Sequence, residues 1–160
     1  MRIGIGFDIH PLQSGRPLVI GGVTIPHDRG LLGHSDGDVL IHAIADGILG
    51  ALGLGDIGRI YPDSDPAFKD LCSLRILDDL VPVLARERMR IENLDAVIIA
   101  EAPRLSPFID AIRESLSKHL RIDFRRINIK AKSAEKLGAL GKGEGIAVHA
   151  AVLLLPDTGI

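Results

Sequence analysis

Cysteine and aromatic residues are scarce in this sequence. Cys72 is the only cysteine in 160 residues, which excludes an internal disulfide bond and a cysteine-based zinc site. Tryptophan is absent and aromatic residues make up 3% of the chain, so the rings that stack on nucleic-acid bases are poorly supplied. A single cysteine is most often a small buried hydrophobic residue, and we assign Cys72 no function.

Charge of one sign and long apolar runs are also missing. The net charge is −2 and the basic residues are scattered, which argues against a nucleic-acid partner. No apolar run approaches the length of about 20 residues that spans a bilayer, so we expect no membrane partner. The sequence starts directly in a strand pattern without a secretory signal, and we expect a cytoplasmic protein, or a plastid one if a transit peptide has been removed.

Residues 1–156 show no repeat, linker or change in composition, and we interpret them as one domain. We expect residues 157–160 to form a mobile tail. Alternation and turn signals predict strands at 2–10, 93–102, 126–132 and 146–155, and a hairpin at 17–26 that turns at Gly21 and Gly22. Helices are predicted from Ser35, by a capping box with Asp38, to about Gly53, at 73–90 with a kink or break at Pro82, and from Ser106 to Leu120.

These elements predict an α+β fold, a two-layer α/β sandwich with a mixed sheet and its helices on one face. The last strand, I-A-V-H-A-A-V-L-L-L, is apolar on both faces, and such strands are usually covered on both sides. We therefore expect a homo-oligomer whose sheets face inward. The alternative is that a loop or the hairpin covers the second face.

The first strand carries metal-ligand residues at its end. Asp8 and His10 lie on the same face as Gly4 and Gly6, and glycine within a strand often marks the close approach of another backbone. The helix predicted to begin near Ser35 is the segment most suited to pack against these glycines. It would bring His42 close to Asp8 and His10. Two histidines and one carboxylate leave a tetrahedral zinc ion with one open position, which is typical of catalytic rather than structural sites.

Other interpretations of these residues stay open. An Asp-x-His at a strand end is often a capped loop, and a lone helical histidine is usually a core residue with its hydrogen bonds satisfied. Asp38 and Asp46 lie one helical turn on either side of His42 and could fix its tautomer. Asp38 could equally be an acidic residue that interacts favourably with the helix dipole.

Three further segments contain residues that could bind a ligand or a cation. His34 and Ser35 precede a helix N-terminus, where phosphate binds readily, or are ordinary loop residues. In K-A-K-S-A-E-K-L-G, residues 130–138, Glu135 could bind a hard cation together with phosphates and water, or the stretch is a charged turn. In I-I-A-E-A-P-R-L, residues 98–105, backbone groups at a strand end could read the edge of a base, although the signal is weak alone.

Together these segments resemble the 2-C-methyl-D-erythritol 2,4-cyclodiphosphate synthase family, from Arg2 to about Leu155. The resemblance rests on G-F-D-I-H, H-S-D-G-D-V-L-I-H-A-I-A-D, G-L-G-D-I-G, Y-P-D-S-D-P-A-F-K, A-E-A-P, K-A-K-S-A-E-K-L-G and G-K-G-E-G-I-A. The first two motifs at this spacing are highly specific.

The resemblance implies a phosphorus–oxygen lyase of the non-mevalonate isoprenoid pathway. Such an enzyme converts 4-diphosphocytidyl-2-C-methyl-D-erythritol 2-phosphate to the 2,4-cyclodiphosphate and CMP, by intramolecular attack of the 2-phosphate on the β-phosphorus. The resemblance also implies a homotrimer with active sites between subunits. A central cavity near the trimer axis can hold an isoprenoid diphosphate in this family.

The resemblance also implies roles for individual residues. Asp8, His10 and His42 would bind Zn²⁺, and Glu135 would bind a second divalent cation, Mg²⁺ or Mn²⁺, together with the substrate. His34 and Ser133 would be catalytic. The other substrate-binding residues would be Ser35, Asp56, Gly58, Tyr61, Asp63, Asp65, Ala100, Pro103, Arg104, Leu105, Lys132 and Lys142, and the substrate would also contact Asp8, His10, His34, Ser133 and Glu135.

The chain departs from the family pattern at three positions. Ser133 stands where threonine is common, which preserves the hydroxyl, and Ala139 stands where phenylalanine is frequent. Lys142 stands where arginine is frequent near the trimer axis, and lysine keeps the charge but loses the planar fork.

Two other functions are compatible with parts of this pattern. A metal-dependent phosphohydrolase could use the open zinc position to activate water. An oligomeric carrier of an isoprenoid diphosphate would need no catalysis. It would, however, give no function to the polar residues Asp38, His42 and Asp46 or to the turn that contains Glu135. The sequence therefore favours the lyase.

Overall fold

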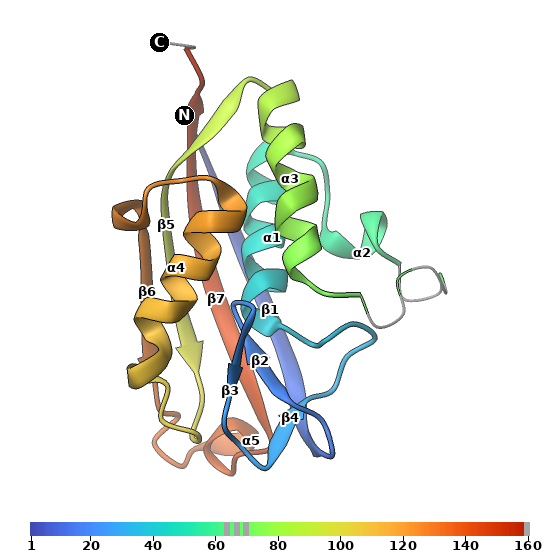
Figure 1. Cartoon of the computed structure of the whole chain (residues 1–160), viewed down its shortest axis with the longest axis vertical. Coiled ribbons are helices and arrows are strands. Elements are labelled where there is room, and N and C mark those ends of the chain that lie inside the picture. The colour runs from blue at the N-terminus through green and yellow to red at the C-terminus, as the bar shows by residue number, and fades with distance from the viewer. Residues whose placement is uncertain (63–64, 66–67, 69–70, 159–160) are drawn as a thin grey trace.

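The computed structural model describes residues 1–62, 65, 68 and 71–158, and it has the expected α+β architecture. A five-stranded sheet has the order β4-β1-β7-β5-β6, and a separate hairpin contains β2 and β3 (Figure 1). Only β5 and β6 pair in parallel, so the sheet is mixed. The strands are β1 (Arg2–Ser14), β2 (Leu18–Ile20), β3 (Val23–Ile25), β4 (Arg29–Leu31), β5 (Met89–Ile99), β6 (Ile127–Lys132) and β7 (Gly145–Pro156).

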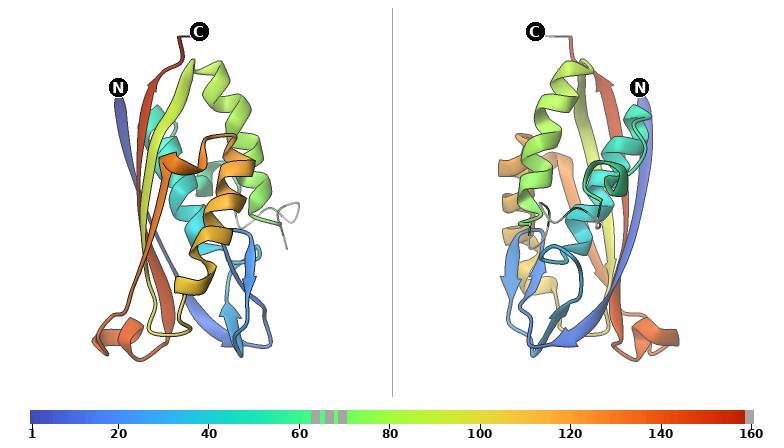
Figure 2. Two further views of the ribbon diagram at one scale, coloured as in Figure 1. Left: turned by 60° about the vertical axis from the view of Figure 1, so that its left-hand side comes forward. Right: turned by 90° about the vertical axis from the view of Figure 1, so that its right-hand side faces the viewer.

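The three long helices lie on one face of the sheet, as the sequence predicts (Figure 2). They are α1 (Val39–Leu52), α3 (Leu74–Arg86) and α4 (Ile109–Leu120), and the two four-residue helices are α2 (Ile57–Ile60) and α5 (Gly138–Gly141). Short 3₁₀ turns at Ser106–Phe108 and Phe124–Arg126 flank α4. No helix in the described part of the chain is long and apolar enough to cross a bilayer.

The predicted start of the first helix was wrong by several residues. The helix begins at Val39, and Asp38 rather than Ser35 is its N-cap residue. The Asp38 carboxylate accepts from the backbone N–H of Ile41 (3.1 Å), and also from those of Gly21 (2.9 Å) and Gly22 (2.7 Å) in the hairpin turn. A buried carboxylate therefore occupies the helix end where the sequence suggested a phosphate, and it joins the helix to the hairpin.

The second long helix and the strand after it also differ from the prediction. Helix α3 runs through Pro82 and ends at Arg86, and β5 begins at Met89. Arg88 has a left-handed conformation (φ 52°), which reverses the chain within two residues. The helix tolerates Pro82 because one apolar face, with Ile76, Leu77, Leu80 and Leu84, is buried against the rest of the molecule. Cys72, which we expected to be buried, is exposed.

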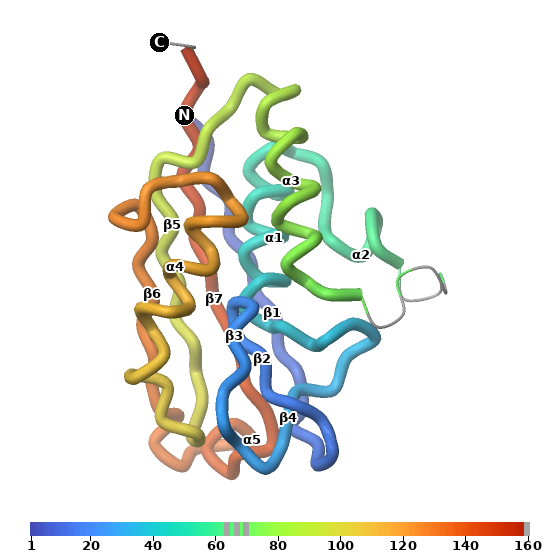
Figure 3. The backbone as a smooth tube through the Cα atoms, viewed as in Figure 1, coloured from blue at the N-terminus to red at the C-terminus, as the bar shows by residue number. Residues whose placement is uncertain are grey.

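The two glycines of β1 mark the close approach of α1, as predicted. A Cβ atom added to Gly4 would lie 1.8 Å from the carbonyl oxygen of Gly47, and one added to Gly6 would lie 1.8 Å from that of Ala43. Any larger residue would push α1 away from the strand. The tube in Figure 3 shows the two backbones running side by side. This contact sets the depth at which side chains of α1 meet those of β1.

The other face of the sheet is not covered by any described element. The side chains of Ile3, Ile5, Phe7 and Ile9 on β1 are 49–74% exposed, and Phe7 packs on the exposed His149 of β7 with ring centroids 4.7 Å apart. The alternative in which the hairpin covers this face is wrong, because β2 and β3 pack on the helix side. A row of exposed apolar residues is typical of an interface.

Candidate functional site

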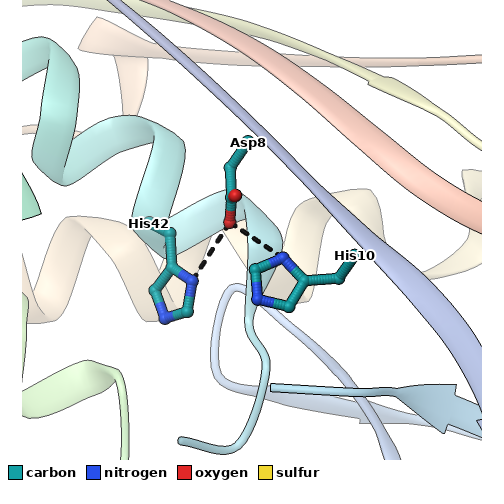
Figure 4. A group of neighbouring side chains, drawn as sticks. All are labelled: Asp8, His10 and His42. Atoms are coloured by element: carbon teal, nitrogen blue, oxygen red, sulfur yellow. Dashed lines mark hydrogen bonds and ion pairs between the residues drawn. The ribbon is translucent and has the colours of Figure 1, made fainter. Parts of the chain in front are cut away.

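Three potential metal ligands meet between β1 and α1 (Figure 4). The Oδ2 atom of Asp8 lies 3.0 Å from Nδ1 of His10 and 3.1 Å from Nδ1 of His42. One ligand atom from each of the three side chains lies within 4.8 Å of the others. The convergence that the glycine contact predicted is therefore present.

The donor set fits a zinc ion. Nδ1 of His10 is buried and makes no hydrogen bond in the structure, although it lies 3.0 Å from Asp8, because the angles are not those of a hydrogen bond. A buried ring nitrogen without a hydrogen-bond partner is costly, and a bound cation would give it a partner. Two imidazole nitrogens and one carboxylate oxygen are ligands that zinc prefers, and three protein ligands leave a position for substrate.

The electrostatics keep the carboxylate of the triad ionised. Burial raises the pKa of Asp8, but its close polar contacts and charge interactions with His10 and His42 together outweigh burial, and its pKa lies well below the usual value. Burial is the largest single effect and lowers the pKa of His42, but the hydrogen bond to Asp8 and the nearby carboxylate charges together outweigh it, and the net shift is upward. The site therefore has one anionic group between two imidazoles.

The outer nitrogen of His42 is held by two serines. Its Nε2 atom lies 3.1 Å from Oγ of Ser73 and 3.2 Å from Oγ of Ser35. The sequence interpretation missed Ser73, which lies 31 residues from His42 and after a loop whose path no local pattern predicts.

The two acids on either side of His42, which could have fixed its tautomer, bind backbone groups instead. The carboxylate of Asp46 accepts from the N–H of Ile57 at 2.8 Å, which ties α2 to α1. Asp38 caps α1, and burial raises its pKa to about 6, although three backbone N–H groups partly offset that effect. The suggestion that either acid fixes the tautomer of His42 is therefore wrong.

A cavity of about 600 Å³ opens beside the triad. His34 and Ser35 line it from the loop before α1, and Arg16 supports this loop by donating to the carbonyl oxygens of Gly33 (3.1 Å) and Ser35 (2.7 Å). Gly58 and Tyr61 line it from α2 and the residue after it. The Tyr61 hydroxyl donates to Asp79 at 2.8 Å, and burial followed by this bond raises the pKa of Tyr61.

A second cavity of about 360 Å³ lies at the β5–β6 edge of the sheet. Its lining includes six residues that the sequence assigned to the substrate: Ala100, Pro103, Arg104, Leu105, Lys132 and Ser133. The backbone N–H of Ala100 donates to the carbonyl oxygen of Lys132 at 2.9 Å, which joins the two sides of this cavity, and the Ala102–Pro103 peptide bond is cis. The triad and this cavity lie towards opposite edges of one sheet.

Glu135 projects from the turn that follows β6. Its carboxylate accepts a hydrogen bond from Ser133, and both Glu135 and Lys136 have left-handed backbone conformations (φ 51° and 62°). Such conformations are uncommon for residues other than glycine and are often found at functional sites. The exposed carboxylate is therefore available to a cation or a ligand.

The remaining candidate residues are less closely connected to the two cavities. Asp56 caps α2, where its carboxylate accepts from the N–H of Arg59 at 3.1 Å. Asp65 and Lys142 are not among the described residues that line either cavity. Asp63 lies outside the residues that the structure describes.

Comparison with known proteins places the chain in one family along almost its whole length. The YgbB family model matches residues 1–155. The 2-C-methyl-D-erythritol 2,4-cyclodiphosphate synthase of Trichlorobacter lovleyi is 51% identical over 157 residues, which cover 98% of this chain and 100% of that protein. The synthase of Geobacillus kaustophilus is 53% identical over 153 residues, which cover 96% and 97% of the two chains.

A solved structure of IspF from Plasmodium falciparum in complex with CDP is also similar. Its TM-score is 0.87 at 36% sequence identity, and the match covers 98% of this chain and 97% of that one. The chain thus belongs to the YgbB family, the family of the 2-C-methyl-D-erythritol 2,4-cyclodiphosphate synthases, which are enzymes of the non-mevalonate isoprenoid pathway.

Proposed function

We propose that this chain converts 4-diphosphocytidyl-2-C-methyl-D-erythritol 2-phosphate to 2-C-methyl-D-erythritol 2,4-cyclodiphosphate and CMP. The observation that carries the proposal is the meeting of Asp8, His10 and His42 beside a cavity large enough for a small anionic ligand. The family membership gives the reaction, and the site gives the residues.

The metal-binding residues follow from their donor atoms. Asp8, His10 and His42 would hold Zn²⁺, and Glu135 would hold a second divalent cation, Mg²⁺ or Mn²⁺, with help from the substrate. When bound, these cations supply Lewis acids that neutralise phosphate charge in the transition state.

The other residues bind and orient a substrate that supplies its own nucleophile. An oxygen of the 2-phosphate forms a bond to the β-phosphorus, and the bond between that phosphorus and the bridging oxygen breaks, so that CMP leaves with the electron pair. The attacking phosphate is ionised at neutral pH, so no general base is required. His34 and Ser35 would hold the attacking end from the cavity wall, and holding reactants in line can lower such a barrier by about 7–11 kcal/mol in the best cases.

The leaving end of the substrate would lie in the second cavity. Backbone groups from Ala100 to Leu105 would bind the cytosine, and Lys132 and Ser133 would bind the diphosphate. The CDP complex of the Plasmodium falciparum relative supports a ligand of this chemistry. Asp56, Gly58, Tyr61, Asp63 and Asp65 would contact the methylerythritol phosphate and the ribose.

We also propose a homotrimer whose sheets face inward. The two cavities lie towards opposite edges of one sheet, so that in a cyclic assembly the β1 edge of one subunit would meet the β5–β6 edge of the next. The exposed apolar row on β1 would then be buried. Lys142 would face a central cavity for an isoprenoid diphosphate, and the bacterial relatives support a cytoplasmic location.

The reaction can be tested directly with the diphosphocytidyl substrate, Zn²⁺ and Mg²⁺. We expect one CMP and one cyclodiphosphate per substrate, with no oxygen from ¹⁸O-labelled water in the product. Asp8→Ala and His42→Ala should each reduce kcat/KM by roughly 10³-fold or more, because a bound cation supplies several kcal/mol of transition-state stabilisation. His119→Ala is the control, because His119 pairs with Asp78 outside the site.

Two outcomes would contradict the proposal. Incorporation of labelled oxygen would indicate a phosphohydrolase that activates water. Tight binding of an isoprenoid diphosphate without turnover, by protein that holds no zinc, would indicate a carrier.

A further inference from the structure

Ser73 is a buried hydroxyl group that does not do what its position suggests. It is the N-cap residue of α3, and its side chain is fully buried, yet it makes no capping hydrogen bond to that helix. Its Oγ atom lies instead between the carboxylate of Asp36 at 2.5 Å and Nε2 of His42 at 3.1 Å. A serine at this position normally caps the helix with its hydroxyl. Here the hydroxyl instead interacts with Asp36 and with His42 of the metal-ligand triad.

The direction of these hydrogen bonds follows from the donors that are present. An ionised carboxylate only accepts, and a serine hydroxyl has one hydrogen to donate. The Ser73 hydroxyl therefore donates to Asp36, and its oxygen is left to accept from His42. The backbone N–H of Ser73 also donates to Asp36 at 2.9 Å, so the carboxylate fixes both the hydroxyl and its main chain.

The position of Asp36 is itself determined by the backbone around it. Its N–H donates to the carbonyl oxygen of Leu71 at 3.2 Å, and its Oδ1 accepts from the N–H of Asp38 at 3.2 Å. Asp36 thus connects the segment before α1 with the segment before α3. His42 lies in the first turn of α1, directly after the first of these segments. The relay Asp36–Ser73–His42 is held from both of these segments.

We propose that Ser73, oriented by Asp36, is a positioning residue that accepts a hydrogen bond from the Nε2–H group of His42 and so turns Nδ1 towards the cation site. This inference rests on the proposed zinc site. Nδ1 is the nitrogen of His42 that faces Asp8, at 3.1 Å, whereas Nε2 faces away from the triad towards the serines. Outer hydrogen bonds of this kind fix the tautomer and orientation of a ligating histidine.

The same assignment has a consequence for Ser35. Its oxygen faces the Nε2–H group of His42 at 3.2 Å and accepts from the N–H of Gly37 at 3.2 Å. Both of these groups are donors, so neither can accept a hydrogen bond from the Ser35 hydroxyl hydrogen. A phosphate oxygen in the adjoining cavity is a suitable acceptor for it.

The test measures zinc binding and the Nε2–H group of His42, without turnover. Zinc affinity is determined by competition with a chelator, and the Nε2–H group is observed by ¹⁵N NMR in zinc-loaded protein. We expect Ser73→Ala to weaken zinc binding by about 10- to 100-fold, as expected for loss of an outer hydrogen-bond partner. In the variant the Nε2–H proton should exchange faster with water than in wild type, because it has lost an acceptor.

Two further variants keep the test decisive. Asp36→Ala removes the acceptor that orients Ser73, and should give the same loss of affinity should Ser73→Ala fail to fold. Ser117→Ala removes another partly buried hydroxyl, which donates to the carbonyl oxygen of Ile122 at 2.6 Å at the end of α4, and should leave zinc affinity and the exchange of the His42 Nε2–H proton unchanged. A folded Ser73→Ala or Asp36→Ala protein with wild-type zinc affinity and wild-type exchange of the Nε2–H proton overturns the inference.

The outcomes also separate this inference from the proposed function. If wild-type protein binds no zinc at the triad, both fail. If the wild type binds zinc and releases CMP as expected, but Ser73→Ala and Asp36→Ala bind zinc equally well, only the positioning role fails.

Discussion

The two faces of β1 have opposite compositions and opposite surroundings. The face with Gly4 and Gly6 is buried against α1 and ends in Asp8 and His10, whereas the face with Ile3 and Ile5 is exposed. Within a subunit, therefore, the small residues of this strand are inside and the large apolar ones are outside. The reason is that the approach of a helix backbone needs an absence of side chains, whereas an apolar row can be buried by a second subunit.

The difference teaches how the site is built. Because Gly4 and Gly6 have no side chains, α1 comes close enough to β1 for His42 to reach Asp8. The apolar face is left exposed, and in the proposed trimer it would be buried against neighbouring subunits. Changes on the two faces should therefore fail in different ways, one through folding and the other through assembly.

The largest effect is expected from Gly6→Ala. The added Cβ atom would lie 1.8 Å from the carbonyl oxygen of Ala43, which cannot be relieved by a side-chain rotation, so α1 must move away from the strand. We expect a loss of at least about 4 kcal/mol in the free energy of unfolding, beyond the usual range for overpacking, together with loss of zinc binding. Urea unfolding and chelator competition measure the two effects, and a change below about 1 kcal/mol would show that the close contact is dispensable.

An intermediate effect is expected from Ile5→Glu on the other face. The Ile5 side chain is 74% exposed in the subunit, so the fold should persist, but a charge buried in the proposed interface should raise the dissociation constant of the assembly by roughly 100-fold or more. Analytical ultracentrifugation should show monomers, and activity should fall because the two cavities no longer meet.

Leu54→Glu is the matched control for the assembly experiment. Leu54 is an exposed apolar residue that follows α1, away from the uncovered face of the sheet. It should leave the oligomer intact. If the Ile5→Glu protein assembles like the wild type, the uncovered face of the sheet is not the interface.

The smallest effect is expected from Gly50→Ala, at an exposed position of α1. Gly50 is exposed and an added Cβ atom would meet nothing within 4 Å. Alanine favours a helix interior over glycine by about 0.5–1 kcal/mol, so the midpoint of urea unfolding should rise slightly at constant slope and protein concentration. A destabilised Gly50→Ala protein would mean that another subunit packs closely at this position.

Much of the site was predictable because its signals are local. The alternation in β1 placed Asp8 and His10 on the glycine face, and the glycines themselves predicted the contact that brings His42 to them. The hairpin turn at Gly21 and Gly22 was also correct. These features depend on residue spacing and side-chain size, which the sequence records directly.

Other features were missed because they depend on where distant segments meet. The capping box at Ser35 was wrong because Asp38 has three backbone donors available, two of them from the hairpin. Ser73 carried no signal, because a serine before a helix normally indicates a cap. Local propensity could not predict that a carboxylate from another loop would take its hydroxyl.

The sequence alone determined the α+β pattern, the glycine-lined face of the first strand and the chemical types of the three ligands. The tertiary structure decided which nitrogen of His42 faces Asp8, which hydroxyl holds the opposite nitrogen, and that no described element of the chain covers the apolar row of β1. The physical reason is range: periodicity and side-chain size act between neighbours in the chain, whereas hydrogen-bond direction and burial depend on groups that only folding brings together.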